Sequence, residues 1–316
     1  MREIKKFGER SASQNKVRLS KYILIMEGEK TEPLYFDAVN NNKEKIGISS
    51  LIQLVPMVRT ISEEHWSNPL KLLEEFLRKK TESANHITYK TFIDCIVDTI
   101  YSDDSFNIAN SGFDKVVFSE LMRFYPKNKL NEYIKDIDQE VKNVIQHFKI
   151  WSTFTKIIES YIHQKIEEQT LNLDDDDKIC LVVDRDPDSF KQFNDVLTLC
   201  RDNNVKLYIT NPRFEFFLLL HSPSIDSLDK NKLFTDEGNY LHSELRKLLG
   251  AYSKEKFDTD FFMNHIQDAI NNEKIFSENI EQLENTLGSN VGLLLQELLD
   301  ASWLIICILV IGYLIL

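Results

Sequence analysis

Short apolar runs and amphipathic stretches alternate in the first eighty residues of the chain. Residues 21–26 (KYILIM) and 50–55 (SLIQLV) are apolar runs of strand length. Thr31 and Pro33 are typical of a helix start, and the apolar positions of LYFDAV supply that helix with a buried face. Residues 68–80 repeat their apolar positions at helical spacing and carry cations near the end, which also predicts a helix.

The same alternation returns in the second half of the chain. The run ICLVVDRD (179–186) predicts a strand that ends in two aspartates. A helix is expected over 189–201, a further strand over 205–210, and mostly helices over 225–300. Strands that alternate with helices predict an α/β fold built on a parallel sheet.

Between these two parts, residues 82–174 show helical spacing and few chain breakers, which predicts a mostly helical insertion in the sheet core. The pattern divides the chain into a leader, a split core, an insertion, a helical C-terminal region and a tail. Their expected ranges are 1–20 for the basic leader, 21–81 and 176–222 for the core, 82–175 for the insertion, 223–300 for the C-terminal region and 301–316 for the apolar tail.

The composition is that of a folded protein from a reducing compartment. The chain has 316 residues, of which 42% are hydrophobic and 28% charged, as expected for a folded protein. Its four cysteines form no CxxC pair, so a reducing cytoplasm is expected rather than a disulfide framework or structural zinc site. The polar leader predicts no secretory signal. A net charge of -12 argues against a protein that coats nucleic acid, although an enzyme could still reach phosphates through local cations.

Acidic residues follow three of the predicted strands. Glu27 comes directly after residues 21–26, Asp184 and Asp186 end the run at 179–186, and Glu215 lies just beyond 205–210. The carboxyl ends of parallel strands meet at one edge of a sheet, where ligands collect. Asp184 and Asp186 point to the same side, since side chains alternate along an extended segment. Clustered carboxylates of this kind predict a site for Mg²⁺ or Mn²⁺.

Each acidic residue also has an ordinary structural interpretation. Glu27 and Gly28 could form a turn after a strand, in which the glycine lets the chain bend sharply. An isolated DxD is common on loops, and Glu215 could pair with Arg213 or Lys206. Because the acidic residues occur together at successive strand ends, the metal site is the favoured interpretation.

Four ordered motifs resemble the RloB-like family, whose core is a TOPRIM-type, Rossmann-like domain. They are ILIMEGEKTEPLYFDAV, VVDRDP, ITNPRFEFFLLLH and LGSNVGLLLQELL. The resemblance covers roughly residues 18–80 and 178–299, and it leaves the helical block between them unaccounted for.

This resemblance implies a magnesium-dependent nuclease related to overcoming-lysogenization nucleases, acting on DNA or RNA in anti-phage defence. Glu27 is then a metal ligand or general base, Asp184 and Asp186 are metal ligands, and Glu215 is a further acidic member. Glu32 lies one position further from Glu27 than in the EGxTE form of related nucleases, which leaves its role as a second-metal ligand in question.

Two more residues are candidates with open alternatives. Lys30 could contact a substrate phosphate or be a surface lysine, and His221 could donate a proton or serve in packing or capping. A different class of function also stays open, in which a degenerate TOPRIM fold senses a phage product or nucleotide without catalysis.

The tail, Trp303–Leu316, carries no charge. As a helix it would span about 21 Å, short of the roughly 30 Å hydrocarbon core of a bilayer. It could be a buried terminal element, a short membrane contact or an oligomerisation surface. The expected partners are a nucleic-acid substrate, a defence-operon protein such as an ATPase, a second copy of the chain, and a membrane touched by this tail.

Overall fold

The computed structural model describes residues 20–57, 68–83, 85–101, 112–170, 173, 176–185 and 192–315. Asp186 and all of the predicted basic leader (1–20) except Ser20 therefore lie outside the described residues. The strands are β1 (Ser20–Met26), β2 (Ile52–Pro56), β3 (Lys178–Asp184), β4 (Val205–Asn211) and β5 (Gly288–Ser289).

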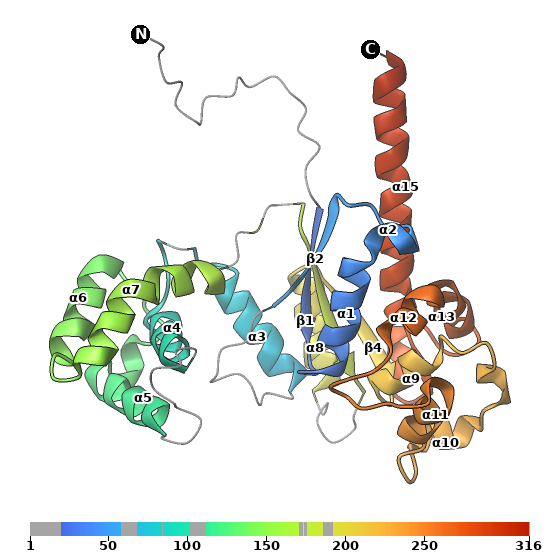
Figure 1. Ribbon diagram of the computed structural model, residues 1–316, viewed down its shortest axis with the longest axis horizontal. Helices are drawn as coiled ribbons and strands as arrows, with labels where there is room; N and C mark the ends of the chain where they lie inside the picture. Colours follow the sequence, from blue (N-terminus) through green and yellow to red (C-terminus); the bar gives the residue numbers. More distant parts are fainter. Residues whose placement is uncertain are drawn as a thin grey trace.

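The helices fall into three groups around this sheet (Figure 1). Those that follow the first two strands are α1 (Thr31–Asn41), α2 (Lys43–Ile46) and α3 (Pro69–Lys79). The helical block consists of α4 (Tyr89–Tyr101), α5 (Phe113–Phe124), η4 (Lys127–Lys129), α6 (Ile137–His147) and α7 (Ser152–Gln169). The later helices are α8 (Phe193–Asp202), α9 (Phe214–Leu219), η5 (Ile225–Ser227), α10 (Lys230–Thr235), α11 (Tyr240–Leu249), α12 (Thr259–Asn264), α13 (Ile266–Glu273), α14 (Ile280–Leu283) and α15 (Val291–Ile315).

The described strands form one sheet in the order β2-β1-β3-β4-β5. β1 pairs in parallel with β2 and β3, and β3 pairs in parallel with β4. β5 runs antiparallel to β4, with Thr210 opposite Ser289 and Asn211 opposite Gly288. The prediction of an α/β fold is confirmed, but the sheet is mixed rather than wholly parallel. The sequence did not indicate β5, because two residues cannot show the period-two pattern of a strand.

Helices cover both faces of the sheet, which explains the continuous apolar run of β1. Tyr22, Leu24 and Met26 pack on the face covered by α1, α9, α12, α13 and α15. Ile23 and Ile25 pack on the opposite face, against side chains of α3 and α8. A strand buried on both faces has no polar side, so it reads as an unbroken apolar segment.

The helical block lies to one side of the sheet, beyond α3 (Figure 1). It has a core of its own, in which Phe92, Ile96, Phe154 and Ile158 are fully buried. This independent core explains why a long helical segment can enter the chain between β2 and β3 without disturbing the sheet.

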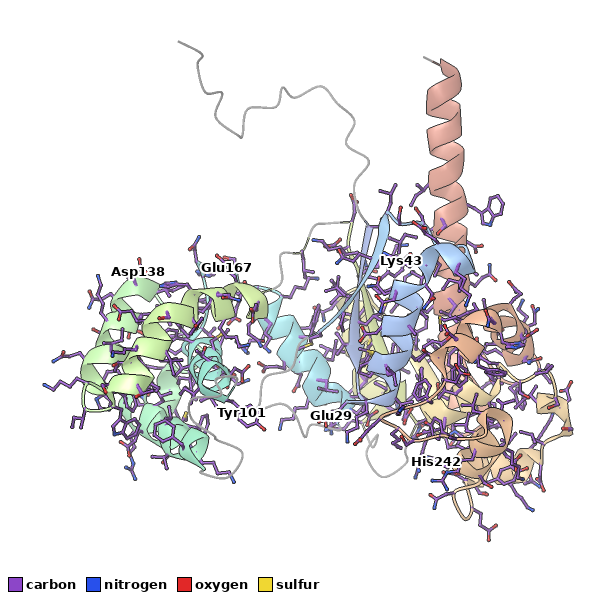
Figure 2. The ribbon with its side chains drawn as sticks, viewed as in Figure 1. Glu29, Lys43, Tyr101, Asp138, Glu167 and His242 are labelled. Atoms are coloured by element: carbon purple, nitrogen blue, oxygen red, sulfur yellow. The ribbon has the colours of Figure 1, made fainter. Side chains whose placement is uncertain are left out.

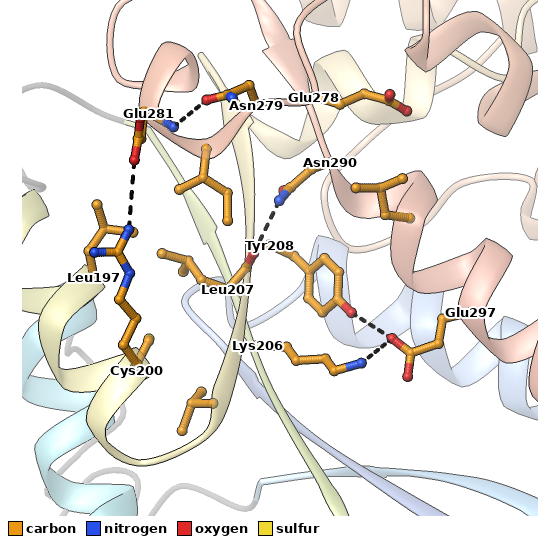
Figure 3. A pocket seen from close by; sticks show the side chains of 14 residues that line it. Leu197, Cys200, Lys206, Leu207, Tyr208, Glu278, Asn279, Glu281, Asn290 and Glu297 are labelled. Carbon is orange, nitrogen blue, oxygen red and sulfur yellow. Dashed lines mark hydrogen bonds and ion pairs between the residues drawn. The ribbon is translucent and has the colours of Figure 1, made fainter.

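The first turns of α15 pack on the face of the sheet that α1 also covers, and the helix then extends away from the sheet (Figure 1). Near its start, Glu297 accepts hydrogen bonds from Lys178, Lys206, Tyr22 and Tyr208, which lie on three neighbouring strands; the contacts from Lys206 and Tyr208 are drawn in Figure 3.

The tail continues α15 to Ile315, with the Trp303 side chain 68% exposed. The side chains of residue 304 and of residues 306–316 lie outside the described part. Among the described helices, none combines the length and the apolar character that crossing a bilayer requires. Contact of this tail with a membrane stays a prediction.

Candidate functional site

A cavity of about 400 Å³ opens at the carboxyl ends of β1 and β3, beside the first turns of α1 and α9. We call it the carboxylate pocket. The residues that line it are Glu27, Gly28, Glu29, Lys30, Thr31, Glu32, Asp184, Phe214, Glu215 and Lys254. Glu29, which lines the pocket, and His242, which lies on α11, are labelled in Figure 2.

Glu27 and Asp184 join the ends of the two central strands. The main-chain amide of Glu27 donates to Val182 and so continues the β1–β3 ladder by one residue. The Glu27 carboxylate accepts a hydrogen bond from the Asp184 amide at 3.2 Å. Asp184 in turn accepts one from the Phe214 amide at 2.8 Å, at the start of α9. The backbone therefore holds both carboxylates in place at the base of the pocket.

Glu32 lies in the first turn of α1, and its side chain is only 5% exposed. The Glu32 carboxylate occupies the space beside Gly28 that a Cβ atom at that position would need. Gly28 is not among the glycines with positive φ. The glycine is therefore required for close approach to Glu32, whereas the sequence had suggested a sharp turn.

Glu215, the second residue of α9, is 2% exposed and faces a group of donors. Its Oε1 atom lies 3.2 Å from Lys254 Nζ and 3.3 Å from His242 Nε2, and it accepts a hydrogen bond from the Tyr252 hydroxyl at 3.4 Å. The sequence had offered Arg213 and Lys206 as partners. In the structure these two cations pair with Asp236 and Glu297 instead.

Burial, together with the crowding of like charges, raises the pKa of two carboxyl groups in the pocket. Burial, together with the charges of Glu32, Glu27 and Glu215, raises the pKa of Asp184 well above its usual value. Burial raises the pKa of Glu32 to about 7, with a further contribution from Glu215, while Lys254 and nearby backbone amides act in the opposite direction. The neighbouring charges thus make Asp184 and Glu32 harder to ionise, which is the electrostatic condition that a bound cation relieves.

Three other candidate residues differ in their placement. Lys30 lines the pocket and forms an exposed ion pair with Glu255. His221 does not line it: the imidazole is fully buried, with Nε2 3.0 Å from the Tyr35 hydroxyl and Nδ1 3.2 Å from the Leu218 carbonyl oxygen. Burial lowers the pKa of His221 to about 3, so the ring is neutral and serves in packing. Asp186 lies outside the described residues.

The sequence did not predict that the segment from Tyr252 to Glu255 belongs to the site. Lys254 reaches Glu215, Tyr252 donates to Glu215, and Glu255 pairs with Lys30, so the segment spans the pocket mouth. These residues lie about forty positions after Glu215 in a region that reads only as polar. No local pattern links them to the pocket, because the fold alone brings them there.

Five of the side chains that line the pocket are carboxylates, and carboxylate oxygens are ligands that Mg²⁺ and Mn²⁺ prefer. Among the residues that the structure describes, no three His, Cys, Asp or Glu side chains are arranged as a metal-binding cluster. Glu27, Asp184 and Glu215 instead accept hydrogen bonds or pair with cations of the protein itself.

Comparison with known proteins places the chain in a family. Residues 118–298, more than half of the chain, match the family model described as RloB-like protein. The match begins within α5, so it includes much of the helical block that the motif resemblance had left unaccounted for, and it does not include β1 or α1. Neither the curated proteins nor the solved structures give a match. The chain belongs to the RloB-like protein family.

Proposed function

We propose that the chain is a nuclease of TOPRIM type that hydrolyses phosphodiester bonds of DNA or RNA with Mg²⁺ or Mn²⁺ in anti-phage defence. Four carboxylates from separate segments, Glu27, Glu32, Asp184 and Glu215, converge on one cavity, and this convergence carries the proposal. Membership of the RloB-like family supports it, because the resemblance of the motifs points to the same chemistry.

Glu27, Asp184 and Glu215 are the residues that would hold the cation, with Glu32 beside them; Asp186 stays a predicted further ligand. The bound cation supplies Lewis acidity and a water of lowered pKa for attack on phosphorus. Lys30 and Lys254 line the same pocket and place positive charge where a phosphate would enter. The Phe214 amide keeps the Asp184 carboxylate oriented throughout.

The test compares wild type with Asp184→Asn on labelled DNA, tRNA and single strands, with Mg²⁺, with Mn²⁺ and with a chelator. Asparagine keeps an oxygen that can accept from the Phe214 amide but removes the charge. We expect wild type to cleave at least one substrate only with metal, and Asp184→Asn to lose that cleavage. Glu281→Gln, at an exposed carboxylate on α14, is the matched control. If wild type and Asp184→Asn behave identically on every substrate, the nuclease proposal is wrong.

A second candidate function is a non-catalytic sensor of the same fold. Its support is that Glu215 is already engaged by Lys254 and His242, and that the described side chains are not arranged as a metal cluster. A sensor would bind a nucleotide or phage product without turnover, and Asp184→Asn would leave its function in a defence assay intact.

A further inference from the structure

A second cavity, of about 640 Å³, lies on the exposed side of α11. We call it the α11 cavity. The residues that line it are Gly238, Asn239, His242, Ser243, Arg246 and Lys247. None of them is acidic, two are cations, and the others offer amide, hydroxyl and imidazole groups. Although the chain has a net charge of -12, the chemistry of this lining suits an anionic ligand.

The amphipathic pattern of α11 produces this surface. Leu241, Glu244 and Leu245 are buried against the rest of the protein. Positions three and four residues apart lie on the same side of a helix, so His242 and Arg246 stand together. Lys247 is engaged by Glu244 at 2.6 Å. Within the described part of the chain, no ion pair involves the Arg246 guanidinium, which leaves its donors for a ligand.

The α11 cavity adjoins the carboxylate pocket through one side-chain contact. His242 lines the α11 cavity, and its Nε2 atom lies 3.3 Å from Oε1 of Glu215, which lines the carboxylate pocket. The imidazole also packs edge-on against Tyr252, with ring centroids 5.0 Å apart. The two cavities are therefore adjacent, and the His242–Glu215 pair lies between them.

We infer that the α11 cavity binds the phosphodiester backbone of a nucleic acid, next to the phosphate that enters the carboxylate pocket. The choice of nucleic acid as the ligand rests on the proposed function. A polyanion approaching several carboxylates is repelled, so the adjacent phosphates need cations of their own. Arg246 provides a planar pair of donors for phosphate oxygens, and Asn239 and Ser243 provide neutral donors that make no distinction between bases.

The test measures binding by fluorescence anisotropy of labelled single-stranded DNA and RNA oligonucleotides to the full chain. All proteins carry Asp184→Asn, so that the probe is not cleaved, and affinity is measured at several salt concentrations. Arg246→Gln and Arg246→Gln/Lys247→Gln are compared with Arg201→Gln. Arg201 is a matched control because it is an arginine of the same exposed kind, 71% exposed, on α8.

We expect Arg246→Gln to weaken binding about tenfold, as for loss of one charged hydrogen bond. The slope of log affinity against log salt should fall by about one in Arg246→Gln, and by no more in the double variant, because Lys247 is engaged by Glu244. Arg201→Gln should change neither quantity. An unchanged affinity and slope in both α11 variants would overturn the inference, as would the absence of binding by the protein that carries only Asp184→Asn at low salt.

Failure of this inference is distinguishable from failure of the nuclease proposal. Cleavage that depends on Asp184, together with binding that does not depend on Arg246, would refute nucleic-acid binding in the α11 cavity and leave the nuclease proposal intact. Binding that depends on Arg246, without cleavage by wild type on any substrate, would support the α11 cavity as a nucleic-acid site in a non-catalytic protein.

Discussion

Substitution of Glu273 by glutamine should make the protein more stable at alkaline pH. Glu273 ends α13, and its side chain is fully buried. Oε1 accepts a hydrogen bond from the Gly292 amide at 2.9 Å, in the first turn of α15, and Oε2 has no hydrogen-bond partner in the described part of the chain. Burial raises the pKa of this carboxyl from 4.5 to about 7, in spite of the Gly292 amide, and Glu278 adds to the rise.

The number of protons bound in the folded and unfolded states determines whether the free energy of unfolding rises or falls with pH. Between pH 4.5 and about 7 the folded state keeps a proton that the unfolded state has released, so the free energy of unfolding falls as the pH rises. At about 1.4 kcal/mol for each pH unit between the two pKa values, the loss grows from about 1 kcal/mol at pH 5 to about 3 kcal/mol at pH 8. Glutamine has nearly the same shape, can still accept from Gly292 and carries no charge, so it removes this loss.

Urea unfolding followed by circular dichroism, at pH 5, 6.5 and 8, measures the effect. The free energy of unfolding of Glu273→Gln, relative to that of wild type, should increase from pH 5 to pH 8. Glu281→Gln, at an exposed carboxylate, should show no such increase. A stability difference that is the same at all three pH values would refute the reasoning. A variant less stable than wild type at pH 8 would show that the ionised carboxylate stabilises the start of α15.

Three further substitutions test other parts of the structure. Gly28→Ala adds a Cβ atom where the Glu32 carboxylate lies; we expect nuclease activity to be lost with little change in far-UV circular dichroism, and full activity would exclude a role for the placement of Glu32. Asn290→Ala leaves the Ile209 amide and the Leu207 carbonyl without their side-chain partner, which should lower the free energy of unfolding by about 2–4 kcal/mol in urea titrations. Phe92→Ala should destabilise the helical block by about 3–5 kcal/mol, and native-state hydrogen exchange should accelerate in α4 and α7 while β1 and β3 stay protected.

The core of the fold could be predicted because its strands are buried on both faces. The segments predicted at 21–26, 179–186 and 205–210 correspond to β1, β3 and β4, and their apolar runs leave little ambiguity. Boundaries were less accurate where polar residues flank an element: the strand expected over 50–55 is Ile52–Pro56, and α8 begins at Phe193 rather than at 189. β5 depends on Asn290 and on the β4 edge, which no local pattern reveals.

The site was predictable where a carboxylate lies at the end of a strand or shortly beyond it, and this includes Glu215. Glu27 and Asp184 could be found in this way, since the strand fixes where the next side chain lies. Glu32 was questioned on spacing, yet the first turn of α1 brings it into the pocket. Lys254 comes from a distant loop, and its role depends on the tertiary placement of α11 and α12 rather than on any pattern in the sequence.

The two ends of the sheet differ in how they would respond to local opening. At one end, Glu297 ties side chains of β1, β3 and β4 to α15 through two lysines and two tyrosines. At the other end, the charges of neighbouring carboxylates oppose the ionisation of Asp184, Glu27 and Asp184 accept hydrogen bonds from backbone amides, and Lys254 reaches Glu215 from a loop. Amide exchange at the Glu297 end should therefore require global unfolding, whereas the pocket end can rearrange at low cost. A ligand could then reshape the pocket while the opposite end keeps the strands in register.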